Sequence, residues 1–164
     1  MLRAMLAAAT VIGLTMPGYT ASLGPQYGSY RDMRRNSEYG DLFFNRDATR
    51  QSESRVLRRF VKVSGSGALE LPRQRGYCFV FNHYDRPNGN DKRVKYFAKI
   101  EKTFADGSKT NETVEGGFTP TPTIWSTEPP DACIRGLRDV KSVSIEFGSD
   151  DGKAFNWQIE FQTE

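Results

Sequence analysis

Apolar and polar residues alternate with a period of two through the last two thirds of the chain, a pattern that predicts β-strands. The clearest case is the pair of segments 142–147 and 155–161, where apolar side chains at every second position are separated by Ser, Glu, Asn and Gln. The turn sequence Asp150-Asp151-Gly152 joins the two segments. Two strands of matching period around a tight turn predict a hairpin with one buried face.

A second hairpin is predicted just before it. Residues 94–104 alternate Val, Tyr, Ala and Ile with Lys, Phe and Glu, as a half-buried strand does. Asp106-Gly107 then turns the chain into residues 109–115. Together these segments predict a long two-stranded ribbon.

Shorter strands are expected at residues 56–64, 68–71 and 77–84. Residues 77–84 (YCFVFNHY) carry apolar side chains on both parities, which is typical of a central strand covered on both faces. Residues 85–91 (DRPNGND) are expected to form a loop, because they satisfy every turn criterion. The proline-rich stretch 118–130 is expected to cross between sheets or to follow an edge, because proline cannot donate to a central ladder.

This pattern predicts an all-β fold, an antiparallel two-sheet sandwich of seven or eight strands spanning residues 56–164. An immunoglobulin-like or jelly-roll-like arrangement would fit, and a small closed barrel is the alternative. The spacing of Cys78 and Cys133 is similar to the immunoglobulin pattern. However, no tryptophan follows on the strand after Cys78 and no tyrosine lies two residues before Cys133, so we assign an architecture and no family.

The first 21 residues have the organisation of a secretory signal peptide. Arg3 supplies a positive start, residues 4–16 are apolar, and Pro17-Gly18 precede small residues that favour cleavage after Ala21 or Ser22. The apolar run is shorter than the roughly 20 residues that a spanning helix needs. The sequence therefore predicts a secreted or periplasmic protein without a transmembrane segment.

Residues 22–55 are expected to form an irregular, partly disordered arm whose apolar group Leu42-Phe43-Phe44 docks locally. Residues 22–62 hold nine Lys and Arg against five Asp and Glu, whereas residues 63–164 hold thirteen against fifteen. Outside the cytoplasm a basic arm meets acidic proteins or anionic glycans rather than nucleic acid, and Arg31, Arg34 and Arg35 are its candidate contacts. A merely solvated linker is the simpler alternative.

Cys78 and Cys133 are the only cysteines, and an exported chain with an even number most simply pairs them. His83 is the only histidine. It differs from Cys78 by five positions, so a regular strand would place the two side chains on opposite faces and disfavour a Cys/His dyad. No zinc-ligand spacing is present, and the Asp and Asn residues of the loops are those that turns require, so neither a metal nor another cofactor is predicted.

The loops supply the candidate binding residues, together with the aromatic side chains beside them. Tyrosine and tryptophan are frequent binding anchors. The candidates are Tyr84, Asp85, Asn88, Asn90, Asp91 and Trp125. Trp125 could equally plug one end of the sandwich.

The leading hypothesis is an exported, non-enzymatic binding module for a protein or glycan partner. The alternatives are a structural subunit of an envelope or surface assembly, and a small secreted hydrolase or enzyme inhibitor. A long, unpaired edge strand would favour assembly.

Overall fold

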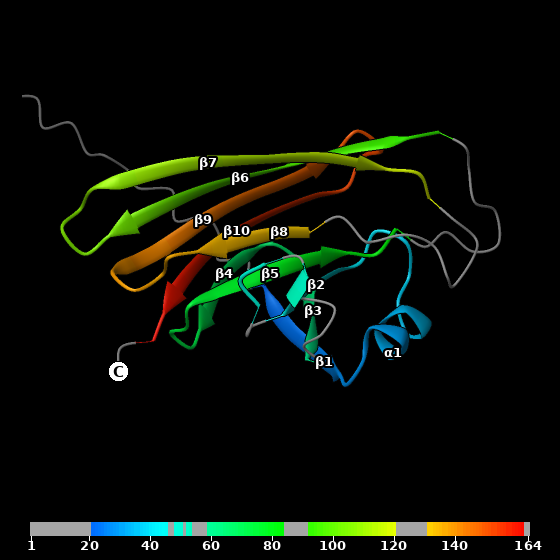
Figure 1. Ribbon diagram of the computed structural model, residues 1–164, viewed down its shortest axis with the longest axis horizontal. Helices are drawn as coiled ribbons and strands as arrows, with labels where there is room; N and C mark the ends of the chain where they lie inside the picture. Colours follow the sequence, from blue (N-terminus) through cyan, green and yellow to red (C-terminus); the bar gives the residue numbers. More distant parts are fainter. Residues whose placement is uncertain are drawn as a thin grey trace, which may run out of the picture.

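The computed structural model describes residues 21–45, 48–50, 52–53, 59–83, 92–120 and 131–162. They form two five-stranded sheets packed face to face, which confirms the all-β sandwich, and neither sheet closes into a barrel (Figure 1). Sheet I has the strand order β1-β3-β2-β5-β8, and sheet II has the order β4-β10-β9-β6-β7. The strands are β1 (Ser22–Tyr27), β2 (Leu42–Asn45), β3 (Phe60–Ser64), β4 (Gly67–Leu71), β5 (Gly76–Phe81), β6 (Val94–Phe104), β7 (Lys109–Phe118), β8 (Asp131–Arg135), β9 (Val140–Ser149) and β10 (Ala154–Phe161).

Both predicted hairpins are present, and both lie in sheet II. β9 pairs with β10 through an antiparallel register that places Ile145 opposite Trp157. β6 pairs with β7 over ten residue pairs without a register shift. Gly107 and Gly152 have φ values of 84° and 92° in the connecting turns, a conformation that favours glycine. The predicted central strand is also confirmed, because all six residues of β5 are buried and the strand lies between β2 and β8.

One pairing departs from the predicted antiparallel arrangement. β4 runs parallel to β10, with Leu69 opposite Ile159. Alternation of apolar residues places a side chain on a face but does not set strand direction. The direction of β4 depends on how the chain leaves sheet I after β3, through the turn at Gly65 and Gly67.

The expected irregular arm is corrected for residues 22–45, which contribute two further strands, β1 and β2. The eight strands β3 to β10 agree with the seven or eight predicted for residues 56–164. β1 pairs with β3 at an edge of sheet I, and β2 lies inside that sheet between β3 and β5. All four residues of β2 are buried. The Leu42-Phe43-Phe44 group is therefore part of a central strand, too short to show a period by itself.

Burial on both faces of sheet I has a simple cause. The main core between the sheets contains Leu42, Phe44 and Phe81 from one parity of β2 and β5. On the other parity, Phe43 and Val80 join a second cluster with Phe60 and Met33. Met33 belongs to α1 (Tyr30–Arg35), a short helix that begins with Ser29 as its N-cap and contributes to the cover over the outer face of sheet I.

Candidate functional site

The loop residues selected from the sequence lie outside the described residues. These are Tyr84, Asp85, Asn88, Asn90, Asp91 and Trp125. Residues 1–20, which contain most of the predicted signal peptide, lie outside them as well. Their proposed roles therefore remain predictions.

The three arginines of the predicted basic arm lie on α1, but they do not share one environment. Arg31 and Arg35 are exposed, whereas Arg34 is only 2% exposed, with its guanidinium carbon 5.6 Å from the centre of the Tyr30 ring. The helix turns Met33 and Arg34 toward the protein and leaves the neighbouring arginines in solvent. The buried Arg34 side chain therefore cannot meet a partner without rearrangement.

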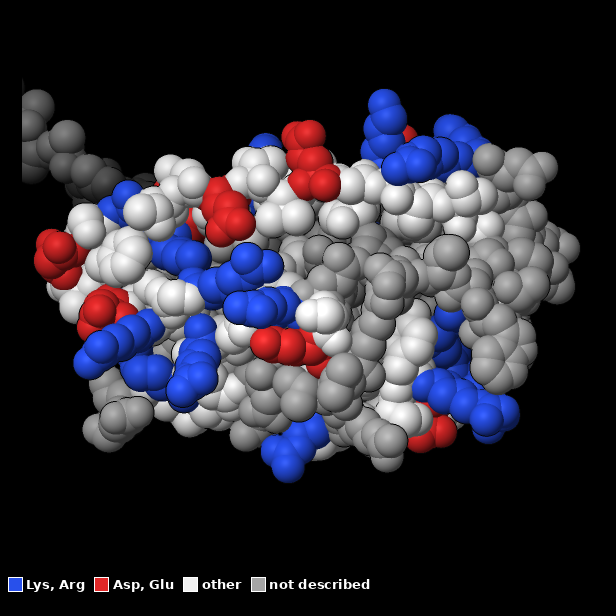
Figure 2. All heavy atoms as spheres, viewed as in Figure 1, with Lys and Arg blue, Asp and Glu red and all other residues white. Residues whose placement is uncertain are grey.

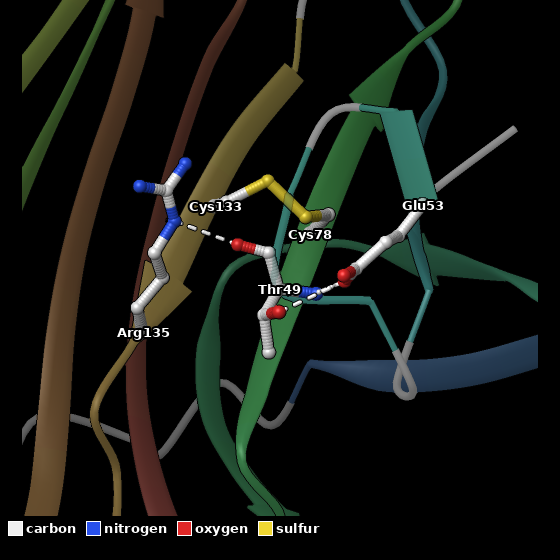
Figure 3. The surroundings of a disulfide bond; sticks show 5 residues. All are labelled: Thr49, Glu53, Cys78, Cys133 and Arg135. Atoms are coloured by element: carbon white, nitrogen blue, oxygen red, sulfur yellow. Dashed lines mark hydrogen bonds between the residues drawn. A yellow bond between two sulfur atoms is a disulfide. The ribbon is translucent and has the colours of Figure 1, made fainter.

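The predicted disulfide is present, and it joins neighbouring strands of one sheet rather than the two sheets. Cys78 on β5 lies directly opposite Cys133 on β8. Figure 3 shows the segment that packs beside it: Arg135 Nε donates to the carbonyl oxygen of Thr49 at 2.6 Å, and the Glu53 carboxylate accepts from both the backbone N–H and the hydroxyl of Thr49. These two hydrogen bonds hold the pKa of Glu53 below its ordinary value.

His83 follows the end of β5 and is 1% exposed. Its ring centre lies 5.4 Å from that of Phe118, against the end of β7. Cys78 is bonded to Cys133, so it offers no thiol to this histidine. A Cys/His dyad is thereby ruled out in the oxidised protein.

A cleft of about 670 Å³ opens at one end of the sandwich, between the loop after β4 and the loop after β8. Its lining consists of residues 73–75 and 136–139, and we call it the arginine cleft because three of these residues are Arg73, Arg75 and Arg138. Figure 2 shows several Lys and Arg side chains, with Asp and Glu among them, at the left of the molecule, the end at which Figure 1 places both loops, and further Lys and Arg side chains at the right. Three arginines against one aspartate, Asp139, make the cleft a basic concavity.

Arg73 joins the two loops that line this cleft. Its Nη1 donates to the carbonyl oxygens of Leu137, Arg138 and Val140 at 3.2, 3.1 and 2.9 Å. Its guanidinium also lies over the Phe161 ring, 5.8 Å from the ring centre. Arg73 therefore fastens the loop after β4 to the loop after β8 and fixes the width of the cleft.

Arg75 and Arg138 are exposed, and no hydrogen bond or ion pair joins their side chains to another described residue. Asp139 supplies one carboxylate in the same cleft, and its backbone carbonyl accepts from the N–H of Ala105 in the β6–β7 turn. Next to the cleft, Lys102 Nζ donates to the carbonyl oxygen of Arg135 at 2.7 Å. The arrangement offers two guanidiniums to an anionic group, with a carboxylate beside them that accepts hydrogen bonds.

A smaller cavity of about 320 Å³ lies where β6, β7 and β9 meet the β9–β10 turn. The carboxylates of this turn are already used by the protein itself. Asp150 accepts from the backbone N–H of Lys95 at 3.0 Å, and Asp151 accepts from the hydroxyls of Tyr39 and Ser149. Within the described ranges, no group of three or more His, Cys, Asp or Glu side chains could hold a metal ion.

The hydrogen bonds to Asp151 predict that the stability of the fold falls in acid. Burial opposes ionisation of Asp151, but the hydrogen bonds from Ser149 and Tyr39 outweigh it and lower its pKa. A lowered pKa stabilises the fold above the ordinary Asp pKa, and this contribution is lost as the pH falls through the folded-state value. We expect Tyr39→Phe to raise the pKa of Asp151 and to weaken the fold at neutral pH but not in strong acid. Carboxyl carbon chemical shifts followed through an acid titration measure the pKa of Asp151, with Tyr27→Phe as the control.

Sequence reasoning missed the arginine cleft because its residues come from two short turn segments far apart in the chain. The segments are Arg73-Gln74-Arg75 and Gly136-Leu137-Arg138-Asp139. Neither contains a recognised motif. The available signal was the predicted disulfide: antiparallel pairing of Cys78 with Cys133 brings Arg75 close to Gly136.

The fold and the cleft define the class of protein: a disulfide-bonded β-sandwich with a basic cleft at one end. Comparisons with models of protein families, with curated proteins and with solved structures find no match to this chain. No helix among the described residues is long and apolar enough to cross a membrane.

Proposed function

We propose that this protein is an exported, non-enzymatic binding module whose arginine cleft binds an anionic glycan. The observation that carries the proposal is the pair of exposed guanidiniums, Arg75 and Arg138, in a cleft held open by Arg73. Export is supported by the leader-like sequence of residues 1–21 and by the disulfide, since disulfides persist in oxidising compartments.

The chemistry of the cleft favours a sugar that carries carboxylate or sulfate groups. A guanidinium presents a planar fork of donors that matches these anions, and the resulting charge-assisted hydrogen bonds are stronger than neutral ones. Asp139 repels a second anionic group but accepts hydrogen bonds from sugar hydroxyls. The cleft volume of about 670 Å³ lies in the range of small-ligand sites. A short segment of an acidic polysaccharide satisfies all of these features.

Titration calorimetry with defined tetrasaccharides tests the proposal. The probes are a heparin-derived tetrasaccharide, a galacturonate tetrasaccharide and, as the neutral control, maltotetraose. We expect at least one acidic probe to bind, and we expect Arg75→Gln with Arg138→Gln to weaken that binding by on the order of ten- to a hundred-fold, because two charge-assisted contacts are lost. Binding should also weaken as salt is added.

The matched control changes the same number of charges elsewhere. Lys95→Gln with Lys99→Gln removes two exposed cations from the outer face of sheet II, away from the cleft, and should leave binding within about two-fold of the unaltered protein. Equal binding of maltotetraose, or unchanged binding after loss of both cleft arginines, would contradict the proposal. Binding of a polyglutamate peptide but of neither acidic tetrasaccharide would assign the cleft to an acidic protein instead.

A further inference from the structure

Sheet II ends at β7, and its outer edge is long and unpaired by any described strand. β7 contains ten residues and pairs only with β6, so it forms the upper rim of the sandwich in Figure 1. Most of its residues are exposed. An edge of this kind presents a row of backbone donors and acceptors that can pair with another strand.

The hairpin hydrogen bonds show which residues direct these groups outward. The N–H of Phe104 donates to the carbonyl oxygen of Ser108 at 2.9 Å, so this pair belongs to the hydrogen-bonded set. Bonded and non-bonded pairs alternate along an antiparallel ladder, and the β6–β7 register has no shift. The even-numbered residues of β7 therefore bond to β6, and the odd-numbered residues turn their N–H and C=O groups to the free edge. The outward-directed residues are Lys109, Asn111, Thr113, Glu115 and Gly117.

β7 lacks the devices that protect another edge of the molecule. At one edge of sheet I, β1 carries Pro25, and its register shifts between Leu23 and Gln26. A proline and a bulge both obstruct the addition of a further strand. β7 contains no proline and no bulge, and it is twice as long as the five-residue edge strands β4 and β8. Only its charged side chains can select what pairs with it.

Those charges are complementary to a second copy of the same strand. In an antiparallel pair with Glu112 at the two-fold axis, Lys109 of each copy lies opposite Glu115 of the other, and Asn111 lies opposite Thr113. All four residues are exposed and direct their backbone groups outward, so the same register satisfies the hydrogen-bond ladder and two pairs of opposite charge. The two Glu112 side chains face each other, which is the one repulsive pair in this arrangement.

We propose that β7 is a self-association edge, through which two copies of the chain join their second sheets into one continuous antiparallel sheet. The interface is isologous, as expected for a two-fold dimer. The interface does not include the arginine cleft, so either proposal can fail without affecting the other. A dimer of this form would carry two clefts, and an acidic polysaccharide with repeated charged groups could engage both.

Charge reversal tests the register. Sedimentation equilibrium over a range of concentrations is expected to show a monomer–dimer equilibrium. Lys109→Glu and Glu115→Lys should each raise the dimer dissociation constant about ten-fold, because each converts two attractive cross-strand pairs into two repulsive ones. The double variant carrying both changes should return to the original value. Lys109 also pairs with Glu101 of its own chain at 2.8 Å, so thermal melts must show that each variant remains folded.

Backbone and like-charge variants give a second, separate measurement. Thr113→Pro removes an outward-directed N–H without removing a β6–β7 hydrogen bond and should abolish dimerisation, whereas Thr113→Ala should preserve it. Glu112→Gln should tighten the dimer several-fold by removing the repulsion at the axis. A protein that is monomeric at every concentration would overturn the proposal. The proposal would also be overturned if the charge reversals left the dimer dissociation constant unchanged, or if the double variant did not restore it. This test holds even if Thr113→Pro unfolds the chain.

Discussion

Replacing Phe43 with alanine is expected to lower the free energy of unfolding by about 3–5 kcal/mol, the cost of removing a fully buried phenylalanine from a well-packed site. Phe43 is 0% exposed and packs with Met33, Phe60 and Val80 between sheet I and α1. Its ring also meets Tyr27 edge-on, with ring centres 5.8 Å apart. A small domain has a total stability of only about 5–15 kcal/mol, so this single change removes a large share of it.

Urea denaturation of the folded, oxidised protein measures the effect. Leu23 provides the matched control, because it is a large apolar residue in the same N-terminal region but is 46% exposed. Leu23→Ala should change the stability by no more than about 0.5 kcal/mol. If Phe43→Ala had an equally small effect, residues 22–45 would not contribute to the folded core as the structure shows.

Periodicity predicted the hairpins of sheet II because each strand has one buried and one solvated face. Val143, Ile145 and Phe147 face the core, and the residues between them are partly or fully exposed. The same reasoning could not find β2, whose four residues are all buried. Phe43 faces α1 while Leu42 and Phe44 face sheet II, so three successive residues are apolar and show no alternation. A buried strand of this length has the sequence appearance of a short apolar group in a loop.

Strand direction and the function of the loops were beyond what periodicity can provide. β4 is parallel to β10 because of the path of the chain between the sheets, which is a tertiary property. Arg34 was grouped with Arg31 and Arg35 by charge, although the helix turns it toward the protein. The role of Arg73 depends on three carbonyl oxygens from residues 137–140, and a single arginine beside a proline gives no sign of this.

The position of the cleft could be predicted more closely from the sequence than the roles of its individual residues. Once Cys78 is paired with Cys133 on antiparallel strands, positions equally far from each cysteine in opposite directions must be neighbours. The structure shows this register, with Gly76 opposite Arg135 and Tyr77 opposite Ile134. Extending this register by one residue beyond the sheet places Arg75 beside Gly136. A disulfide predicted from the sequence thus carries information about which loops converge.

The same disulfide gives the second large effect. Cys78→Ala with Cys133→Ala is expected to lower the free energy of unfolding by about 4 kcal/mol, because the bond closes a loop with a sequence separation of 55 residues and restricts the unfolded chain. Alanine is preferable to serine here. Cys78 is 0% exposed, and a serine hydroxyl at that position would add the cost of a buried polar group.

The reduced protein separates the effect of the bond from the effect of the substitutions. Denaturation of the unaltered protein in the presence of dithiothreitol should lose a similar amount of stability, whereas the double alanine variant should not respond to the reductant. Because β8 is an edge strand held by β5 alone in the described part of the chain, loss of the bond should also loosen the loop that carries Arg138. We therefore expect reduction to weaken acidic tetrasaccharide binding under conditions where the protein stays folded. If the reductant changed neither stability nor binding, the disulfide would have no part in holding the cleft.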